Sequence, residues 1–396
     1  MSTLSIVVPA HNEERAIGPI LDRILAQSGE IRRTIADIQQ IEVIVVNDGS
    51  SDRTAEIASS YPGVTLVTHE RNQGYGAALK TGMRAATGDL IGFLDADGTY
   101  PPEALPTLVH ELLDRKADIV TGSRMAGTKT GMPWLRWLGN KIFAGLVSLV
   151  GRRRIGDSAS GMRVLRRDAL ARLGLLPDGM NFIVAMSTQA IHENLRTIEV
   201  PIAYDERVGE SKLRVIQDGL AFTSTIFRIS ILYDPLTFFA LLGLSAIGAG
   251  VVIALPPLYT WMVDGQVADW FIYRLVTVLT LFLGGFSIAV FGILAGHTIA
   301  LLRGETPAPR GRVEGVLLSP RLPLPLATAG LLLLVLAPAV SYRAIGEYLA
   351  TAHIETHWSP VLLGATSFLL GLQALLAGVL ISLLGHARQW KAGWLG

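Results

Sequence analysis

The chain has 396 residues, half of them hydrophobic, and its formal net charge is +1. This length allows two domains, and the apolar content is too high on average for an ordinary soluble enzyme. The lack of cysteine excludes disulfides, thiolate metal sites and cysteine nucleophiles.

The charged residues are unevenly distributed along the chain. Only 15 of the 67 charged side chains lie in the 163 residues from Asp234 to Gly396. A boundary near Asp234 therefore separates a predicted soluble domain from a predicted membrane domain. Residues 1–9 lack the positively charged segment and the long apolar segment of a secretory signal peptide, so we expect the first domain to stay cytoplasmic. The near-zero net charge says little about partners, and we expect no nucleic acid among them.

Strands and helices alternate in the first domain. Residues 4–8 form an apolar run that Pro9 ends, and a helix with regularly spaced apolar positions follows. Such alternation implies a mostly parallel sheet that is covered on both faces. Further strands are predicted at 42–46, 64–68, 90–94 and 119–121, and further helices at 53–61 and 77–86.

Two carboxylates follow the strand at 90–94. Asp95 and Asp97 are separated by one small residue, and Gly98 then turns the chain. In an extended segment, residues i and i+2 project from the same face, so both carboxylates can approach one hard cation. This geometry suits a divalent metal that holds a diphosphate, and the alternative is a solvated turn. Ligands of such sheets bind at the carboxyl ends of the strands, where Glu13, Asp48, Gly74 and Asp95 would lie.

Four segments carry a family resemblance. They are Ile-Val-Val-Pro-Ala-His-Asn-Glu at 6–13, Val-Asn-Asp-Gly-Ser-Ser-Asp at 46–52, Arg-Asn-Gln-Gly-Tyr-Gly at 71–76 and Asp-Ala-Asp at 95–97. Together they resemble glycosyltransferase family 2, in the branch of dolichyl- and undecaprenyl-phosphate hexosyl synthases. The resemblance implies an α/β, single-nucleotide-binding glycosyltransferase A-type fold with a mixed, mostly parallel sheet. A dinucleotide fold is disfavoured, because the loop at 71–76 lacks the third glycine and does not follow the first strand.

The resemblance also implies a donor site. The nucleoside would be held by Pro9, His11, Glu13, Val46 and Asp48. Asp95 and Asp97 would bind the diphosphate and its Mg²⁺ or Mn²⁺. The remaining residues of the predicted nucleotide-sugar site are Ala96, Thr99, Arg124, Arg207 and Lys212.

Two later segments match the family near the acceptor and the phosphates: residues 157–163, Asp-Ser-Ala-Ser-Gly-Met-Arg, and residues 207–212, Arg-Val-Gly-Glu-Ser-Lys. Because the reaction gathers several negative charges, the basic residues after these strands and loops can serve the phosphates. Asp157 would act either as a base or by orienting an arginine. The expected acceptor-phosphate residues are Arg124, Arg163 and Ser211. The expected catalytic residues are Asp97, Asp157, Arg207 and Lys212.

Helices of membrane character occupy the rest of the chain. Residues 134–154 predict an amphipathic helix that lies on a membrane surface or packs on the sheet. The expected domains are a transferase domain at 1–213, an interfacial amphipathic helix at 214–233 and an all-α, four-helix membrane domain at 234–396. Spans of roughly 20 residues or more are predicted at about 236–258, 275–302, 322–342 and 361–384. Close helix contacts are expected at Gly243, Gly248, Gly250, Gly284 and Gly285.

The loop charges predict an orientation. The loop after the first span carries Asp264 and Asp269 and no Lys or Arg before Arg274, whereas the loop between the second and third spans is rich in arginine. The positive-inside rule then places the transferase domain, the arginine-rich loop and both termini in the cytoplasm. The sequence leaves open whether the protein forms a homo-oligomer.

These observations predict metal-dependent, inverting transfer of a hexose from a nucleoside diphosphate sugar to a polyprenyl phosphate on the cytoplasmic membrane face. The sequence does not decide whether the donor is a UDP-glucose-like sugar or GDP-mannose. The glucose-synthase-like branch of the family would be expected to have glutamates near Asn181 and Ala185, and both are missing here. One alternative is a processive polysaccharide synthase, but no glutamine here begins the Gln-x-x-Arg-Trp segment of those enzymes. The other alternative is a non-catalytic membrane scaffold with a degenerate transferase domain.

Overall fold

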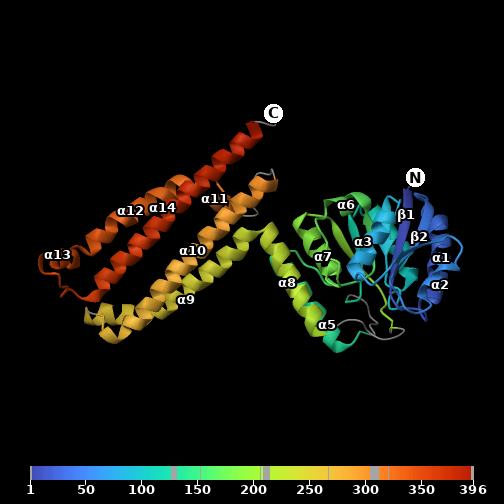
Figure 1. Ribbon diagram of the computed structural model, residues 1–396, viewed down its shortest axis with the longest axis horizontal. Helices are drawn as coiled ribbons and strands as arrows, with labels where there is room; N and C mark the ends of the chain where they lie inside the picture. The colour runs from blue at the N-terminus through green and yellow to red at the C-terminus, as the bar shows by residue number, and fades with distance from the viewer. Residues whose placement is uncertain are drawn as a thin grey trace. The chain divides into compact units, whose positions relative to one another are not determined.

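The computed structural model describes residues 2–125, 132–151, 153–205, 207, 215–265, 267–303, 312–319 and 321–393. The chain divides into two compact units, Met1–Ser230 and Ile231–Gly396. The first unit is a layered α/β domain and the second is helical, and each is described by itself (Figure 1).

One sheet of seven strands organises the described part of the first unit, in the order β3-β2-β1-β4-β6-β5-β7. Neighbouring strands are parallel except at β6, which runs antiparallel to both β4 and β5. The predicted mixed, mostly parallel sheet is therefore confirmed. The strands are β1 (Ser2–Ala10), β2 (Ile38–Asp48), β3 (Val64–His69), β4 (Leu90–Phe93), β5 (Ile119–Ser123), β6 (Arg163–Arg166) and β7 (Thr197–Pro201).

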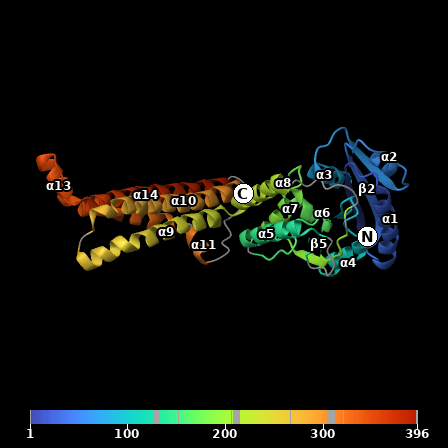
Figure 2. The same ribbon diagram turned by 90° about the horizontal axis from the view of Figure 1, so that it is seen from below.

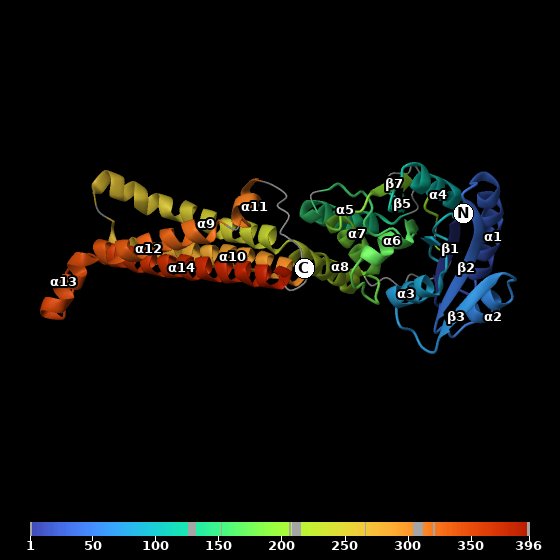
Figure 3. The ribbon, with the colours of Figure 1, turned by 90° about the horizontal axis from the view of Figure 1, so that it is seen from above.

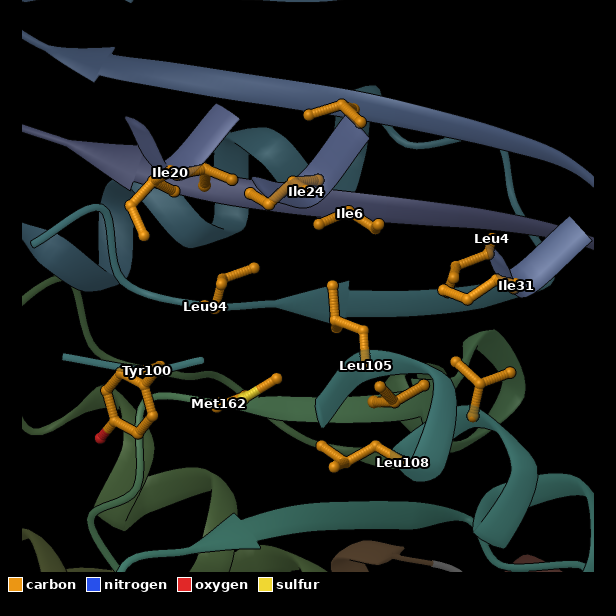
Figure 4. Close-up of a cluster of buried hydrophobic side chains, with 14 of the residues drawn as sticks. Leu4, Ile6, Ile20, Ile24, Ile31, Leu94, Tyr100, Leu105, Leu108 and Met162 are labelled. Atoms are coloured by element: carbon orange, nitrogen blue, oxygen red, sulfur yellow. The ribbon is translucent and has the colours of Figure 1, made fainter. Parts of the chain in front are cut away.

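Helices cover both faces of this sheet, because successive strand residues point to opposite sides. Leu4, Ile6 and Val8 of β1 are buried against α1, α2 and α4, as Figure 4 shows in part. Val7 points the other way, into a core with α3, α6 and α7. The helices of this unit are α1 (Ile17–Thr34), α2 (Thr54–Ser59), α3 (Tyr75–Ala85), α4 (Leu105–Asp114), α5 (Trp134–Gly151), α6 (Arg167–Arg172), α7 (Phe182–His192) and α8 (Val215–Tyr233).

Helices α5 and α8 form a further layer outside α7 (Figure 2). Val147 of α5 and Phe222 of α8 are buried with Val184 of α7. The helix predicted at 134–154 thus packs on other helices rather than directly on the sheet, because its apolar stripe meets α7 and α8. Trp134 and Leu149 nevertheless remain 73% exposed, so contact of α5 with a membrane surface stays a prediction.

The second unit contains four described helices that are long and apolar enough to cross a membrane. The stretches predicted at 236–258, 275–302 and 361–384 lie within α9, α10 and α14. The third predicted span is shortened, because α12 ends at Val340 and a separate helix, α13, begins at Tyr342. The helices are α9 (Pro235–Asp264), α10 (Ile272–Arg303), α11 (Arg312–Leu317), α12 (Pro323–Val340), α13 (Tyr342–Thr351) and α14 (Trp358–Gly393).

Glycines set the closest approaches between these helices. A methyl group on Gly243 of α9 would lie 2.5 Å from the carbonyl oxygen of Gly285 of α10, and the reverse distance is 2.6 Å. Gly330 of α12 and Gly371 of α14 form a second reciprocal pair, where α12 lies along α14 (Figure 3). Small residues allow such backbone contacts.

The predicted glycine contacts are therefore confirmed at Gly243 and Gly285, and also at Gly250, which packs on Phe282. They are wrong at Gly248 and Gly284, where a methyl group would meet no described atom beyond its own helix backbone within 4 Å. Glycine content indicates that a helix can pack closely but does not indicate which turn faces the neighbour.

Candidate active site

A cavity of about 410 Å³ lies at the carboxyl ends of β1, β2 and β4, the edge where the sequence places its polar residues. Of the predicted site residues, it is lined by Pro9, His11, Glu13, Asp48, Asp95, Ala96, Asp97 and Arg207. Its remaining walls are Ala10, Asn72, Gly74, Tyr75, Ala78, Gly179, Met180, Gln217 and Asp218. Parallel strands end at one edge of the sheet, so residues far apart in sequence meet there.

Three predicted donor-site residues that the structure describes, Val46, Thr99 and Arg124, do not line this cavity, and Arg124 lines a second one. The Val46 side chain is buried in the core beside Val7. Thr99 is 2% exposed, and both its backbone N–H and its hydroxyl donate to Asp97 Oδ1, at 3.1 and 2.6 Å. Thr99 therefore fixes the rotamer of Asp97 instead of facing a ligand.

A second cavity, of about 170 Å³, adjoins the first and extends toward α5, α7 and α8. Both cavities are lined by Tyr75, Asp95, Asp97 and Arg207. The walls of the second cavity combine basic and apolar side chains, among them Arg124, Arg136, Leu135, Phe143 and Phe222. The two carboxylates thus stand where a cavity lined by acidic side chains meets one walled by basic and apolar side chains.

Asp95 and Asp97 are held by specific hydrogen bonds at this junction. The Tyr75 hydroxyl donates to Asp95 Oδ1 at 2.7 Å. Burial, together with the negative charge of Asp97, raises the pKa of Asp95 to about 7. Arg207 bridges Asp97 Oδ2 at 3.1 Å and Glu13 Oε1 at 2.9 Å. Two carboxylates that line the same cavities repel each other, and a cation between them would relieve the repulsion.

The donor set fits a hard divalent cation that completes its coordination from a ligand. No group of three or more acidic or histidine side chains in the described ranges could hold a metal ion without help. Mg²⁺ usually takes one or two carboxylates together with substrate phosphates, which is the number offered by Asp95 and Asp97. Gly161 leaves the space for this arrangement, because a methyl group there would lie 2.8 Å from Asp95 Cγ.

Asp48 forms the floor of the larger cavity. Its carboxylate accepts hydrogen bonds from the backbone N–H groups of Gln73 and Gly74, at 2.8 and 2.9 Å. His69 Nδ1 donates to Asp48 Oδ1 at 2.7 Å, and the other ring nitrogen contacts the Thr81 hydroxyl at 2.9 Å. The glycine-bearing loop is therefore fastened to the end of β2 through one carboxylate.

Arg124 and Asp157 form a buried ion pair in the wall next to the second cavity. Arg124 Nε and Nη2 donate to the two carboxylate oxygens at 2.9 and 2.7 Å, and its backbone N–H donates at 3.0 Å. Asn140 adds a fourth donor at 2.9 Å. Burial alone would raise the pKa of Asp157, but Arg124 holds it below its ordinary value. Of the two roles open to Asp157, this geometry favours orienting an arginine over acting as a base.

Comparison with known proteins identifies the family. The family model described as glycosyl transferase family 2 matches residues 5–174. The low-salt glycan biosynthesis hexosyltransferase Agl6 of Haloferax volcanii is 31% identical over 309 residues, which are 77% of this chain and 71% of that relative. The chain belongs to glycosyltransferase family 2.

Other relatives of this family 2 glycosyltransferase are named for lipid-linked sugars. The dolichyl-phosphate hexose transferase of Haloferax volcanii is 33% identical over 57% of this chain and 93% of the relative. The undecaprenyl-phosphate 4-deoxy-4-formamido-L-arabinose transferase of Edwardsiella ictaluri is 28% identical over 79% of this chain and 94% of the relative. The family resemblance read from the four sequence segments is confirmed, including its polyprenyl-phosphate branch.

One predicted acceptor residue of this glycosyltransferase lies elsewhere. Arg163 is 2% exposed and lines neither active-site cavity. Its Nε donates to the carbonyl of Ser160, and its Nη2 donates to the carbonyl of Ser158 and the hydroxyl of Ser187. The side chain turns into the protein, so the structure does not bring Arg163 to either cavity, and its acceptor-phosphate role stays a prediction. Ser211 and Lys212 lie outside the described residues.

Sequence reasoning also missed residues that line the glycosyltransferase cavities. Tyr75 follows the glycine of its loop, which is a signal that it could approach a ligand, and Arg136 is a basic residue on an amphipathic helix. Tyr100 and Tyr204 carry no such signal, although the Arg124 guanidinium lies 5.9 and 5.5 Å from their ring centres. These contacts depend on loops that meet only in the folded chain.

Proposed function

We propose that this glycosyltransferase moves a hexose from a nucleoside diphosphate sugar to a polyprenyl phosphate, with Mg²⁺ or Mn²⁺ as cofactor. The observation that carries the proposal is that a cavity lined by acidic side chains meets one walled by basic and apolar side chains at Asp95 and Asp97. The names of its relatives, which act on dolichyl and undecaprenyl phosphates, support the same lipid class for this chain.

The larger cavity suits the donor. Asp48, already fixed by His69 and two backbone N–H groups, presents an acceptor to the N–H of a nucleotide base. Asp95 and Asp97 would hold the metal ion, which when bound neutralises charge on the departing diphosphate. Arg207, which bridges Glu13 and Asp97, adds a cation beside the same phosphates.

The second cavity suits the acceptor. Arg124 and Arg136 supply charge for a lipid phosphate, while Leu135, Phe143 and Phe222 supply apolar walls for the first part of an isoprenoid chain. Asp157 keeps Arg124 in place. The cavity therefore combines the two chemical features of a polyprenyl phosphate.

The reaction needs little proton transfer. An oxygen of the lipid phosphate, ionised at neutral pH, attacks the anomeric carbon of the hexose. The bond between that carbon and the nucleoside diphosphate breaks, its electron pair leaves with the diphosphate, and the anomeric configuration inverts. This account matches the engagement of Asp157 in an ion pair, since no general base has to be free.

The second unit would keep the active site at a membrane. Its four apolar helices favour a multi-pass membrane protein. By the positive-inside rule, the transferase domain and both termini would lie in the cytoplasm. The donor would then come from the cytoplasm and the acceptor from the adjacent leaflet.

Transfer assays on the full chain in detergent test this proposal. A panel of UDP- and GDP-hexoses would be incubated with undecaprenyl or dolichyl phosphate and Mg²⁺ or Mn²⁺, with lipid-linked product measured directly. Asp97→Asn should lower turnover by about 100-fold or more, by analogy with the loss of one charge-stabilising group. Asp114→Asn, an exposed acidic residue at the end of α4, is the matched control. Full turnover by Asp97→Asn, or no transfer from any donor by the unaltered protein, would reject the proposal.

A further inference from the structure

A third cavity in the transferase unit is separate from the active site. Its volume is about 320 Å³, and its lining residues line neither active-site cavity. It lies between β5, β7, α7 and the segment 154–157. The residues that carry the argument are Thr121, Arg154, Arg163, Ser187 and Glu199.

Arg163 makes no direct ion pair within the described part of the chain, although Asp157 and Glu199 line the same cavity. The side chain is buried, and its three hydrogen bonds go to uncharged oxygens of Ser158, Ser160 and Ser187. Among the described residues it forms no ion pair, and its Nη1 has no hydrogen-bond partner. The neighbouring carboxylate of Asp157 is occupied by Arg124. A buried charge without a partner is costly, so such groups normally meet an opposite charge.

Other groups that line the cavity also leave an excess of positive charge and an unused hydroxyl. Arg154 is exposed and makes no ion pair within the part of the chain that the structure describes. The Thr121 hydroxyl, 6% exposed as a residue, is likewise without a partner in the described ranges. Glu199 is the acidic residue that faces these cations, and its Oε1 accepts backbone N–H groups of Gly156 and Asp157 at 2.7 and 3.1 Å. Asp157 also lines the cavity, but its charge is matched by Arg124, so Arg154 and Arg163 share the charge of Glu199 alone.

We propose that this cavity binds a small oxyanion of the phosphate type, held by Arg163 and Arg154 with the Thr121 hydroxyl. The guanidinium groups match the oxygens of such an anion in charge and geometry. Burial lowers the pKa of Arg163 to about 10, although the negative charges of Asp157 and Glu199 act in the opposite direction. This site goes beyond the proposed transfer reaction, which uses neither Arg163 nor Arg154.

The anion would act on the active site through one short segment. Arg163 holds the carbonyls of Ser158 and Ser160, and the same segment begins with Asp157, the partner of Arg124. Further along it, the Gly161 N–H donates to the Tyr100 hydroxyl at 2.7 Å. An oxyanion that neutralises Arg163 therefore stabilises the segment that positions Arg124 beside the second cavity.

Phosphate binding to the full chain in detergent tests the proposal. Thermal unfolding and titration calorimetry would compare phosphate with chloride at equal ionic strength, without donor or divalent metal. We expect phosphate to raise the unfolding temperature of the unaltered protein. Arg154→Gln should weaken phosphate binding about tenfold, the effect of losing one hydrogen bond to a charged group. Arg153→Gln, the same charge change one residue away, should leave binding unchanged.

Two further variants separate this site from the active site. Thr121→Val removes the hydroxyl at constant shape and should weaken phosphate binding, whereas Arg136→Gln alters the second cavity and should not. Arg163 is left intact, because its loss would remove three hydrogen bonds to buried oxygens. No phosphate effect beyond that of chloride overturns the proposal, as does equal weakening by Arg153→Gln and Arg154→Gln. A phosphate effect that disappears only in Arg136→Gln assigns the anion to the active site and also overturns it.

Discussion

His69 and Asp48 form a buried hydrogen-bonded pair beneath the larger cavity, with His69 Nδ1 2.7 Å from Asp48 Oδ1. Because a carboxylate only accepts, the proton lies on Nδ1, and the other ring nitrogen then accepts from Thr81 or is itself protonated. His69 is therefore a positioning residue for Asp48, which faces the cavity.

Replacement of His69 should weaken donor binding rather than slow the chemical step. We expect His69→Leu to raise the KM for the nucleotide sugar about tenfold, since one hydrogen bond to a charged group is lost. His69→Asn, which can still donate to Asp48, should restore much of the affinity. Steady-state kinetics with saturating acceptor measure both variants. A purely structural role predicts instead that kcat falls and that asparagine gives no recovery.

The Arg124–Asp157 pair predicts an acid-dependent contribution to stability. Asp157→Asn leaves the Arg124 charge buried without a partner and should lower stability by about 3–5 kcal/mol. In the folded protein the pKa of Asp157 lies below its ordinary value of 3.8, so the pair stabilises above that value and its contribution is lost as the pH falls through the folded-state pKa. Thermal unfolding across this range should show the gap between the two proteins narrowing in acid. An equal gap at every pH, or an equal loss in Asp114→Asn, contradicts the assignment.

Arg136 should affect the lipid substrate alone. It lines the second cavity and is absent from the wall of the first. We expect Arg136→Gln to raise the KM for polyprenyl phosphate about tenfold, through loss of a charge-assisted contact, with the donor KM unchanged. Arg53→Gln, on the exposed surface of the sheet's other side, is the charge-matched control. A rise in the KM for the nucleotide sugar would contradict the assignment of Arg136 to the polyprenyl-phosphate site.

The sequence best predicted the positions of site residues that follow the carboxyl ends of parallel strands. Glu13, Asp48 and Asp95 were expected at one sheet edge, and they line one cavity because parallel strands end together. The position of Arg163 away from the active-site cavities could not be predicted, because a sequence motif does not show which way an arginine side chain points. Arg163 begins β6, the antiparallel strand between β4 and β5, and its side chain turns into the protein. The partners of an ion pair such as Arg124 and Asp157, 33 residues apart, are likewise set by the fold.

Gly161 offers a test of the carboxylate pair that leaves both carboxylates in place. A methyl group at this position would lie 2.8 Å from Asp95 Cγ, closer than real side chains approach, and the backbone there is not left-handed. Gly161→Ala must therefore displace either Asp95 or the segment that holds Gly161. We expect Mn²⁺ affinity in the presence of donor and turnover to fall together, each by about 100-fold if Asp95 is lost as a ligand.

Gly29→Ala provides the matched control for this change. Gly29 lies in α1, and a methyl group there would have no neighbour within 4 Å among the residues that the structure describes, its own helix backbone apart. Its replacement should preserve both Mn²⁺ affinity and turnover, and alanine in place of glycine should slightly favour the helix. Manganese binding can be followed by electron paramagnetic resonance, and unfolding temperature reports whether each variant is folded. A folded Gly161→Ala protein that binds Mn²⁺ and turns over normally would show that Asp95 does not need its observed position, and the metal assignment would then rest on Asp97 alone.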